Sequence, residues 1–292
     1  MHLDSQTDLE TYLNNPSDQS RELATAISAA KSGAEILTRY FADLGSAEIQ
    51  TKQTGDQYQG IVTQADVEAE RAIVAEIKKT FPDHEFLGEE EHSASADAEH
   101  LWVIDPLDGT NNFAHGIPHF AVSIAYYRNG KAHCGVIIDP CRNDTFTTER
   151  GEGAFWHKPD GTRIRASVNQ HARFEDTMIA VGFYYDRGPM MQATLAATEE
   201  LFQQNIHGIR RFGTAALDLV SVGIGRYGGY FEYKLSPWDF AAAQLFVTEA
   251  GGMVTTCSGD PLGLNVSTVL ATNSRLHQQI LPIVKKHGTN LL

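Results

Sequence analysis

Residues 102–110 carry the sequence WVIDPLDGT, in which a short apolar run leads directly into two aspartates. The apolar run has the length and composition of a buried strand. Pro106 favours an extended or turn conformation in the residue before it, and Asp108 with Gly109 is a tight-turn pair. We therefore expect Asp105 and Asp108 to lie at a strand end, with their carboxylates converging on one point.

Two further acidic segments have the same character, FLGEEE at 86–91 and PWDFAA at 237–242. Taken alone, each segment has a simpler explanation. Asp-Pro and Asp-Gly pairs are common turn formers, and a glutamate run is usually a solvated surface. Asp239, at a helix start, would interact favourably with the helix dipole. All three segments follow an apolar or aromatic run, and together they indicate a carboxylate site whose hard oxygen ligands suit Mg²⁺ better than zinc.

The first half of the chain predicts two helices followed by an antiparallel sheet. Apolar residues recur at helical spacing over 21–44, and a second helix begins near Thr63. Between them, residues 46–61 are polar and contain glycines, so we predict a mobile loop there. Asn129 and Gly130 separate two apolar runs, which is typical of a tight hairpin between strands.

The second half predicts a different organisation. After about residue 166, short apolar strands alternate with helical patterns, which indicates an α/β layer. We expect a layered α/β fold in three parts: a polar extension at 1–18, an α+β domain at 19–165 and an α/β domain at 166–292. The second domain is expected to complete a site that lies between the two.

The composition restricts the function. The formal net charge is −14, which disfavours nucleic acid and anionic membrane as partners. Phosphorylated metabolites would also be repelled unless a bound cation reversed the local field. The three cysteines have no metal-ligand spacing and are expected to be free thiols in a reducing compartment. The N-terminus lacks the pattern of a signal peptide and no apolar run is long enough for a membrane span, so we expect a cytoplasmic protein.

The three acidic motifs resemble the inositol monophosphatase family of Mg²⁺-dependent, lithium-sensitive phosphatases. The resemblance covers about residues 20–285 and rests on GEE at 88–90, DPLDGTNNF at 105–113 and WD at 238–239. It implies an alternating αβαβα sandwich of the inositol monophosphatase and fructose-1,6-bisphosphatase type. It also implies a homodimer and inhibition by lithium.

The resemblance further implies a site for two or three Mg²⁺ ions. The predicted ligands are Glu89, Asp105 and the Leu107 carbonyl for the first ion, and Asp105, Asp108 and Asp239 for the second. Asp66 would hold water or a third, weaker ion. Like charges about 4 Å apart repel by about 4 kcal/mol at an effective dielectric constant near 20, so such a cluster needs bound cations. A metal ion also lowers the pKa of water, and the sequence has no motif for a phosphoenzyme nucleophile.

The remaining site residues are assigned by the same resemblance. Gly109 and Thr110 would donate hydrogen bonds to phosphate, and Thr110 with Glu89 would orient the attacking water. The residues expected to contact the substrate are Asp108, Gly109, Thr110, Gly213, Thr214, Ala215, Glu232 and Asp239. Glu232 would bind a substrate hydroxyl, with a solvent-exposed strand position as the alternative explanation.

Other residues with potential chemistry have structural explanations that we favour. His115 and His119 are expected to pack or to form loop hydrogen bonds, since imidazole is rare in hard-oxygen sites. Arg210 and Arg211 would form surface ion pairs or bind a second phosphate. The aromatic run at 183–185 is expected to pack in the core or at an interface, with a wall near the site as the alternative.

The expected reaction is Mg²⁺-dependent hydrolysis of a small phosphate monoester, with inositol monophosphate as the leading candidate. Alternatives are fructose 1,6-bisphosphate, 3′-phosphoadenosine 5′-phosphate, NADP or histidinol phosphate, or a catalytically weak binding or regulatory homologue. Two departures from the family pattern bear on the choice. Asn111 replaces a frequent threonine, and the segment from Lys52 to Gly60 is longer than usual.

Overall fold

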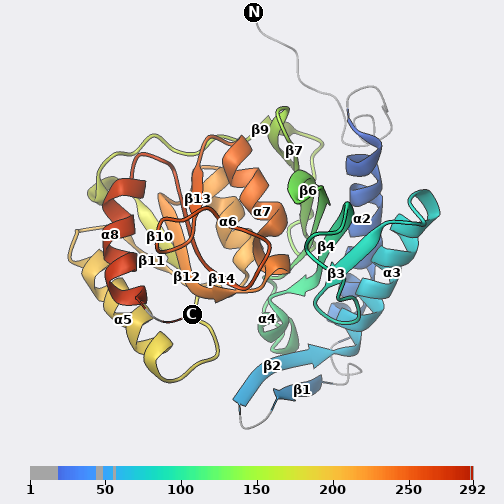
Figure 1. The fold of residues 1–292 in the computed structure, drawn as a ribbon, viewed down its shortest axis with the longest axis horizontal. Helices are drawn as coiled ribbons and strands as arrows, with labels where there is room; N and C mark the ends of the chain where they lie inside the picture. Colours follow the sequence, from blue (N-terminus) through green and yellow to red (C-terminus); the bar gives the residue numbers. More distant parts are fainter. Residues whose placement is uncertain (1–18, 44–48, 55–56, 290, 292) are drawn as a thin grey trace, which may run out of the picture.

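The computed structural model describes residues 19–43, 49–54, 57–289 and 291, and between 49 and 63 it describes the backbone alone. The polar extension predicted at 1–18 lies outside the described residues. The described elements stack in five layers, helix, sheet, helix, sheet, helix (Figure 1). The layered α/β fold and its alternating order of layers are thereby confirmed.

A seven-stranded sheet forms the second layer. Its strands lie in chain order: β3 (Glu85–Gly88), β4 (His100–Asp108), β5 (Ala121–Arg128), β6 (Lys131–Asp139), β7 (Asp144–Glu149), β8 (Gly153–His157) and β9 (Arg163–Arg165). All neighbours are antiparallel except β3 and β4, which are parallel. Asn129 and Gly130 join β5 to β6 with φ of 50° and 69°, as a type I′ hairpin requires, which confirms the predicted hairpin.

Two helices, α2 (Arg21–Ala42) and α3 (Gln64–Thr80), cover the outer face of this sheet (Figure 1). Ser20 begins α2 because its side chain accepts a hydrogen bond from the Leu23 backbone N–H at 3.2 Å. A Cβ at Gly33 would lie 2.8 Å from a side-chain carbon of Ile73, so the helices cross closely at this glycine. Their apolar stripes and the facing strands form one continuous core.

The second half of the chain supplies the other three layers. Its five-stranded sheet has the order β11 (Gly208–Arg210), β10 (Met178–Val181), β12 (Gly229–Leu235), β14 (Ser267–Thr272) and β13 (Met253–Thr255). Helices α6 (Ala215–Gly223) and α7 (Pro237–Glu249) lie between the two sheets, and α5 (Pro189–Phe202) and α8 (His277–Gly288) cover the outside. A short 3₁₀ helix, Phe174–Asp176, precedes β10. Helix α7 is apolar on nearly every side because it packs against both sheets.

The polar stretch at 46–61 is not a loop throughout, so that prediction was wrong. Residues Ile49–Thr54 form β1 and Gln57–Thr63 form β2, an antiparallel pair. Alternating polar residues gave no buried face to detect, yet several of them favour extended backbone. Strand β2 runs beside the short helix α4 (Thr110–Ala114), so the longer segment lies next to the DGT motif (Figure 1).

Two observations concern the predicted environment of the protein. Cys134, Cys141 and Cys257 form no disulfide bond, as expected from their spacing. Within the described residues, no helix combines the length and apolarity that a membrane crossing demands.

Candidate active site

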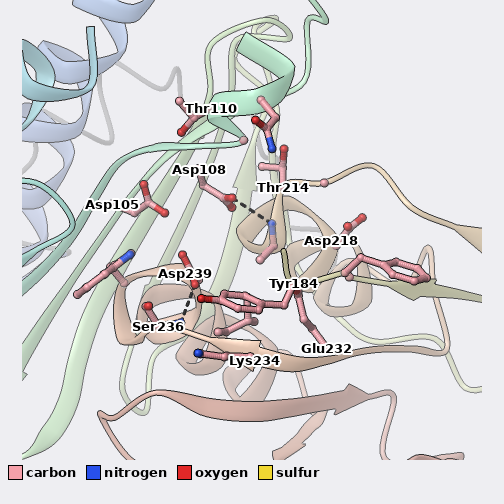
Figure 2. Close-up of a pocket in the computed structure, with 18 of the residues that line it drawn as sticks. Asp105, Asp108, Thr110, Tyr184, Thr214, Asp218, Glu232, Lys234, Ser236 and Asp239 are labelled. Carbon is pink, nitrogen blue, oxygen red and sulfur yellow. Dashed lines mark hydrogen bonds between the residues drawn. The ribbon is translucent and has the colours of Figure 1, made fainter. Parts of the chain in front are cut away.

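A cavity of about 430 Å³ opens where strand ends and helix starts from both halves of the chain meet (Figure 2). The β3–β4 loop, the end of β4, and the starts of α4, α6 and α7 contribute residues to its lining. The predicted residues that line it are Glu89, Asp105, Leu107, Asp108, Gly109, Thr110, Gly213, Thr214, Ala215, Glu232 and Asp239. Asp66 is not among the residues that line this cavity, but its Oδ1 contacts the Thr110 hydroxyl, which does line it.

An irregularity in β4 brings the two aspartates of the first motif together. Side chains on a regular strand alternate between faces, so residues three apart would point to opposite sides. Here Asp105 pairs with Ser123 and Asp108 with Ala121, so three steps along β4 match two steps along β5. Pro106, which has no N–H to offer the ladder, lies within this bulge. Both carboxylates consequently face the cavity.

Asp105 is the most deeply buried carboxylate of the group, with 1% of its surface exposed. Its Oδ1 accepts the Leu107 backbone N–H at 3.0 Å, while its buried Oδ2 has no hydrogen-bond partner in the described part of the chain. Burial raises the pKa of Asp105 well above its usual value, and the charges of Glu89 and Asp108 raise it further. The charged form of the Asp105 carboxyl therefore needs a nearby cation to be stable in this position.

Asp108 is held by the start of α6. Its two carboxylate oxygens accept the backbone N–H groups of Ala215 at 3.2 Å and Ala216 at 2.6 Å, and Figure 2 marks one hydrogen bond to Asp108. Burial raises the pKa of Asp108 to about 7, although these two N–H donors act in the opposite direction. The N–H of Ala215 thus binds a carboxylate of the protein, while the residue itself lines the cavity.

Asp239 is both a helix-capping residue and a member of the acidic cavity, the two roles considered for it from the sequence. It is the third residue of α7, and its Oδ2 accepts the Ser236 backbone N–H at 2.7 Å in a capping box (Figure 2). The same carboxyl lines the cavity, where desolvation and the charge of Asp108 raise its pKa. Helix capping thus positions a carboxylate that also faces the other acidic groups.

Glu70 holds the GEE segment and was missed by the sequence analysis. This fully buried residue of α3 accepts the backbone N–H groups of Glu90 at 2.9 Å and Glu91 at 2.8 Å. Its Oε1 also lies 2.7 Å from Nδ1 of His92. A Cβ at Gly88 would lie 2.6 Å from Oε2 of Glu70, so only glycine fits there. The carboxylate thereby fixes the backbone that carries Glu89.

Thr110 lies between two hydrogen-bond acceptors. Its hydroxyl oxygen is 3.0 Å from the Leu107 carbonyl oxygen and 3.2 Å from Oδ1 of Asp66. A hydroxyl has one proton and two lone pairs, so it donates to one of these acceptors and keeps acceptor capacity for a water. This geometry is suited to the predicted orienting role.

Glu232 is buried, with 8% of its surface exposed, so the solvent-exposed alternative is wrong. Its Oε2 accepts the Tyr230 hydroxyl at 2.6 Å. Burial raises the pKa of Glu232 to about 7, against the hydrogen bond from Tyr230 and the charge of Arg211. The carboxyl fits closely against Gly182, whose missing Cβ would lie 1.8 Å from it.

Residues 18–289 match the profile of the Inositol monophosphatase family. The chain belongs to this family. It is 39% identical over 266 residues to an inositol-1-monophosphatase of Mesorhizobium japonicum, which covers 90% of this chain and 96% of the relative. It is 37% identical over 270 residues to a Pseudomonas aeruginosa protein named Nus factor SuhB, which covers 91% and 96%.

A solved structure agrees with the sequence relatives. Extragenic suppressor protein suhB from Bartonella henselae has a TM-score of 0.82 at 38% identity, covering 91% of this chain and 99% of that one. The recognition made from the GEE, DPLDGT and WD motifs is confirmed, and this member of the inositol monophosphatase family is a phosphatase of the hydrolase class.

The cavity fits the metal ions on which inositol monophosphatases generally depend. Several buried carboxylates share it, and one of their oxygens, Oδ2 of Asp105, lacks a hydrogen-bond partner among the described residues. No three His, Cys, Asp or Glu side chains of the described ranges already stand close enough to hold an ion. Oxygen donors such as these carboxylates are the ligands that Mg²⁺ prefers.

The cavity of this inositol monophosphatase homologue also contains residues outside the predicted site. Residues 183–185 line it, and Phe183 and Tyr184 also pack against the hydrophobic core of the second half, so both explanations considered for this run apply. Arg211, Asp218 and Lys234 line it as well. The signal for Lys234 was its even spacing from Glu232 on one strand, which puts both side chains on the same face.

The two histidines after the motif agree with the structural explanation. His115 is exposed and its Nδ1 lies 2.9 Å from the Asn111 carbonyl oxygen. Nδ1 of His119 lies 3.3 Å from Arg142, and neither histidine lines the cavity. Asn111, which replaces the usual threonine, donates its side-chain N–H to the Tyr185 hydroxyl at 3.3 Å.

Proposed function

We propose that this protein hydrolyses a small phosphate monoester with the help of Mg²⁺, and that inositol monophosphate is its leading substrate candidate. The supporting observation is the shared cavity of Glu89, Asp105, Asp108 and Asp239, in which burial and mutual repulsion leave negative charge uncompensated. Two or three bound Mg²⁺ ions would balance this charge, attract the phosphate and ease the deprotonation of water.

The protein's own groups would then divide the remaining work. The Thr110 hydroxyl, fixed by Asp66 and the Leu107 carbonyl, would accept a hydrogen bond from the attacking water and aim it at phosphorus. The backbone N–H groups of Gly109 and Thr110 would hold phosphate oxygens. Asp108 and Asp239 are already fixed by backbone donors, so they would need little rearrangement.

A polyol fits the other end of the cavity. Glu232 keeps one carboxylate oxygen bound to the Tyr230 hydroxyl, which orients the other oxygen for a substrate hydroxyl. Buried Asp218, with 2% of its surface exposed, lines the same region. A ring with several hydroxyl groups would satisfy these acceptors, whereas an aryl phosphate would not.

The proposal has rivals with different predictions. Fructose 1,6-bisphosphate, 3′-phosphoadenosine 5′-phosphate, NADP and histidinol phosphate share the reacting group but differ in the remainder. A binding or regulatory role is a different class, and the Pseudomonas relative is named a Nus factor. The complete set of Glu89, Asp105, Asp108, Thr110 and Asp239 supports an enzyme. Our proposal also includes a homodimer, sensitivity to lithium, a cytoplasmic location and no nucleic-acid or membrane partner.

The test is phosphate release from a panel of monoesters with and without Mg²⁺. We expect hydrolysis only with Mg²⁺ and, among substrates whose hydrolysed phosphate is their only anionic group, the highest kcat/KM for inositol monophosphate. Asp105→Asn should abolish both turnover and Mg²⁺ binding measured by calorimetry, whereas Asp97→Asn, at an exposed position, should change neither. Near wild-type hydrolysis by Asp105→Asn would overturn the metal assignment, and an aryl phosphate as the best of these substrates would overturn the polyol assignment.

A further inference from the structure

The alternation of side chains along β12 places Lys234 in the cavity. On β12, Tyr230, Glu232 and Lys234 occupy alternate positions and all line the cavity, while Phe231 and Tyr233 pack into the core on the other side. Figure 2 shows Lys234 among the labelled residues of the cavity, beside Tyr184. The alternation therefore places an ammonium group two positions beyond the carboxylate proposed to bind a hydroxyl.

The charge around Lys234 is unbalanced. The acidic residues that line the cavity are Glu89, Glu90, Asp105, Asp108, Asp218, Glu232 and Asp239, and the basic ones are Arg211 and Lys234. The charge of Arg211 lowers the pKa values of Glu232 and Asp218 against the effect of their burial. Over the described residues, Lys234 forms neither an ion pair nor a hydrogen bond.

An aromatic ring holds the Lys234 ammonium in place. Its nitrogen lies 4.4 Å from the centroid of the Tyr184 ring, within the range of a cation–π interaction. Tyr184 in turn meets Tyr185 edge to face at 5.6 Å between centroids. Tyr185 accepts a hydrogen bond from Asn111, next to the DGT motif. The ring that supports Lys234 is thus anchored to the element that would hold the reacting phosphate.

The occupied ring face restricts what the substrate can be. Because Lys234 covers a face of Tyr184, that face does not serve as a stacking surface for a nucleobase. A substrate whose part beyond the phosphate is an uncharged polyol would cover the ammonium without offering it a counter-ion, which costs desolvation energy. An anionic group on the same substrate would pair with it directly.

We propose that Lys234, supported by Tyr184, is a specificity-determining residue that binds an anionic group of the substrate distant from the phosphate to be hydrolysed. The inference rests on the proposed phosphatase function and adds to it that, among polyol phosphates, those with a second anionic group away from the hydrolysed phosphate bind best. Glu232 would then bind a hydroxyl of the substrate, and Lys234 would bind an anionic group at a neighbouring position of the same substrate.

The experiment compares three substrates that differ at one carbon: glucose 1-phosphate, glucose 1,6-bisphosphate and glucuronic acid 1-phosphate. The wild-type enzyme should favour one or both of the substrates that carry a second anionic group. Comparing glucose 1,6-bisphosphate with glucuronic acid 1-phosphate distinguishes a second phosphate from a carboxylate. Lys234→Met should raise KM for the favoured anionic substrate roughly tenfold to hundredfold more than for glucose 1-phosphate. Lys234→Arg should recover part of this difference, and Tyr184→Leu should lose part of it.

The outcomes separate this inference from the function on which it rests. Lys131→Met changes an exposed lysine and should leave all three KM values unchanged. If Lys234→Met affects the three substrates equally, or none of them, the anion-binding role is refuted while the phosphatase function stands. If the wild-type enzyme hydrolyses neither these substrates nor p-nitrophenyl phosphate with Mg²⁺, the proposed function itself fails and the inference falls with it.

Discussion

Replacing Gly182 with alanine would place a methyl group where the carboxylate of Glu232 lies. An ideal Cβ at this position is 1.8 Å from Oε2 and 2.3 Å from Cδ of Glu232, and 2.8 Å from the Tyr230 hydroxyl oxygen. The shortest distance is roughly 1.6 Å less than the 3.4 Å at which ordinary contact begins. Glu232 is buried and bonded to Tyr230, so it cannot yield without losing its position.

The size of the effect follows from this displacement. A shift of about 1 Å in a positioning group can cost on the order of 10²-fold in rate. We therefore expect Gly182→Ala to lower kcat/KM for inositol 1-phosphate by about 10- to 100-fold more than for p-nitrophenyl phosphate, which has no hydroxyl for Glu232. Overpacking should also lower the free energy of unfolding by about 1–3 kcal/mol.

The assay is a double-mutant cycle with Glu232→Ala, read by steady-state kinetics on both substrates and by urea unfolding. Removing the Glu232 side chain creates room for the methyl group, so the double variant should resemble Glu232→Ala alone. Gly263→Ala is the matched control, because its Cβ would meet only the side-chain oxygen of Asn265, at 3.0 Å. Unchanged selectivity in Gly182→Ala, or losses that simply multiply in the double variant, would refute the reasoning.

Three further predictions follow from other parts of the structure. Glu70→Gln loses one of two acceptors for backbone N–H groups, so the GEE loop should loosen and Mg²⁺ affinity measured by calorimetry should fall about tenfold. Burial lowers the pKa of His157 to about 3 from an ordinary 6.5, so only the unfolded chain gains its proton between these pH values. Stability should therefore fall by about 2 kcal/mol for this group between pH 6.5 and 5, and His157→Gln should show a smaller loss in urea unfolding. Gly109 has φ of 96° and its Cβ would meet Thr214 at 2.5 Å, so Gly109→Ala should lower both the melting temperature and kcat.

Each of these predictions has its own contrary outcome. Unaltered Mg²⁺ affinity in Glu70→Gln would show that the loop holds its shape without the second acceptor. An acid dependence as steep in His157→Gln as in the wild type would place the titration elsewhere. A Gly109→Ala variant with wild-type stability would mean that the left-handed backbone there is not required.

The sequence was most informative where a motif or a periodic pattern had one physical solution. The apolar run before Asp105 predicted strand β4, although the strand continues past Asp105 and ends at Asp108. Asn129 with Gly130 predicted a hairpin, because few other residues accept positive φ at both positions. The helix over Arg21–Ala42 was recognisable because its apolar stripe is continuous. The convergence of the acidic segments was expected from the family resemblance and is borne out by the shared cavity.

The features that the sequence did not reveal depend on tertiary contacts. Nothing local in the run at 183–185 distinguishes a cavity wall from a core, because the difference arises only when β10 and β12 are paired. In the sequence Glu70 looks like an ordinary helical glutamate, because its contact with the GEE loop exists only in the folded structure. The strands β1 and β2 have no buried face in their sequence pattern, and polar residues alone gave no reason to prefer a ribbon over a loop.

The bulge in β4 has a consequence for anyone who tries to make this protein more robust. The two aspartates share a face only because the strand gains a residue relative to its neighbour between Asp105 and Asp108. Deleting Leu107 would restore an ideal ladder and would probe how much folding energy the irregularity sacrifices. The same edit would leave the two aspartates two positions apart and still on one face, but it would remove the Leu107 N–H that holds Oδ1 of Asp105 and the Leu107 carbonyl beside the Thr110 hydroxyl. Sheet idealisation and catalysis are therefore competing objectives at this position.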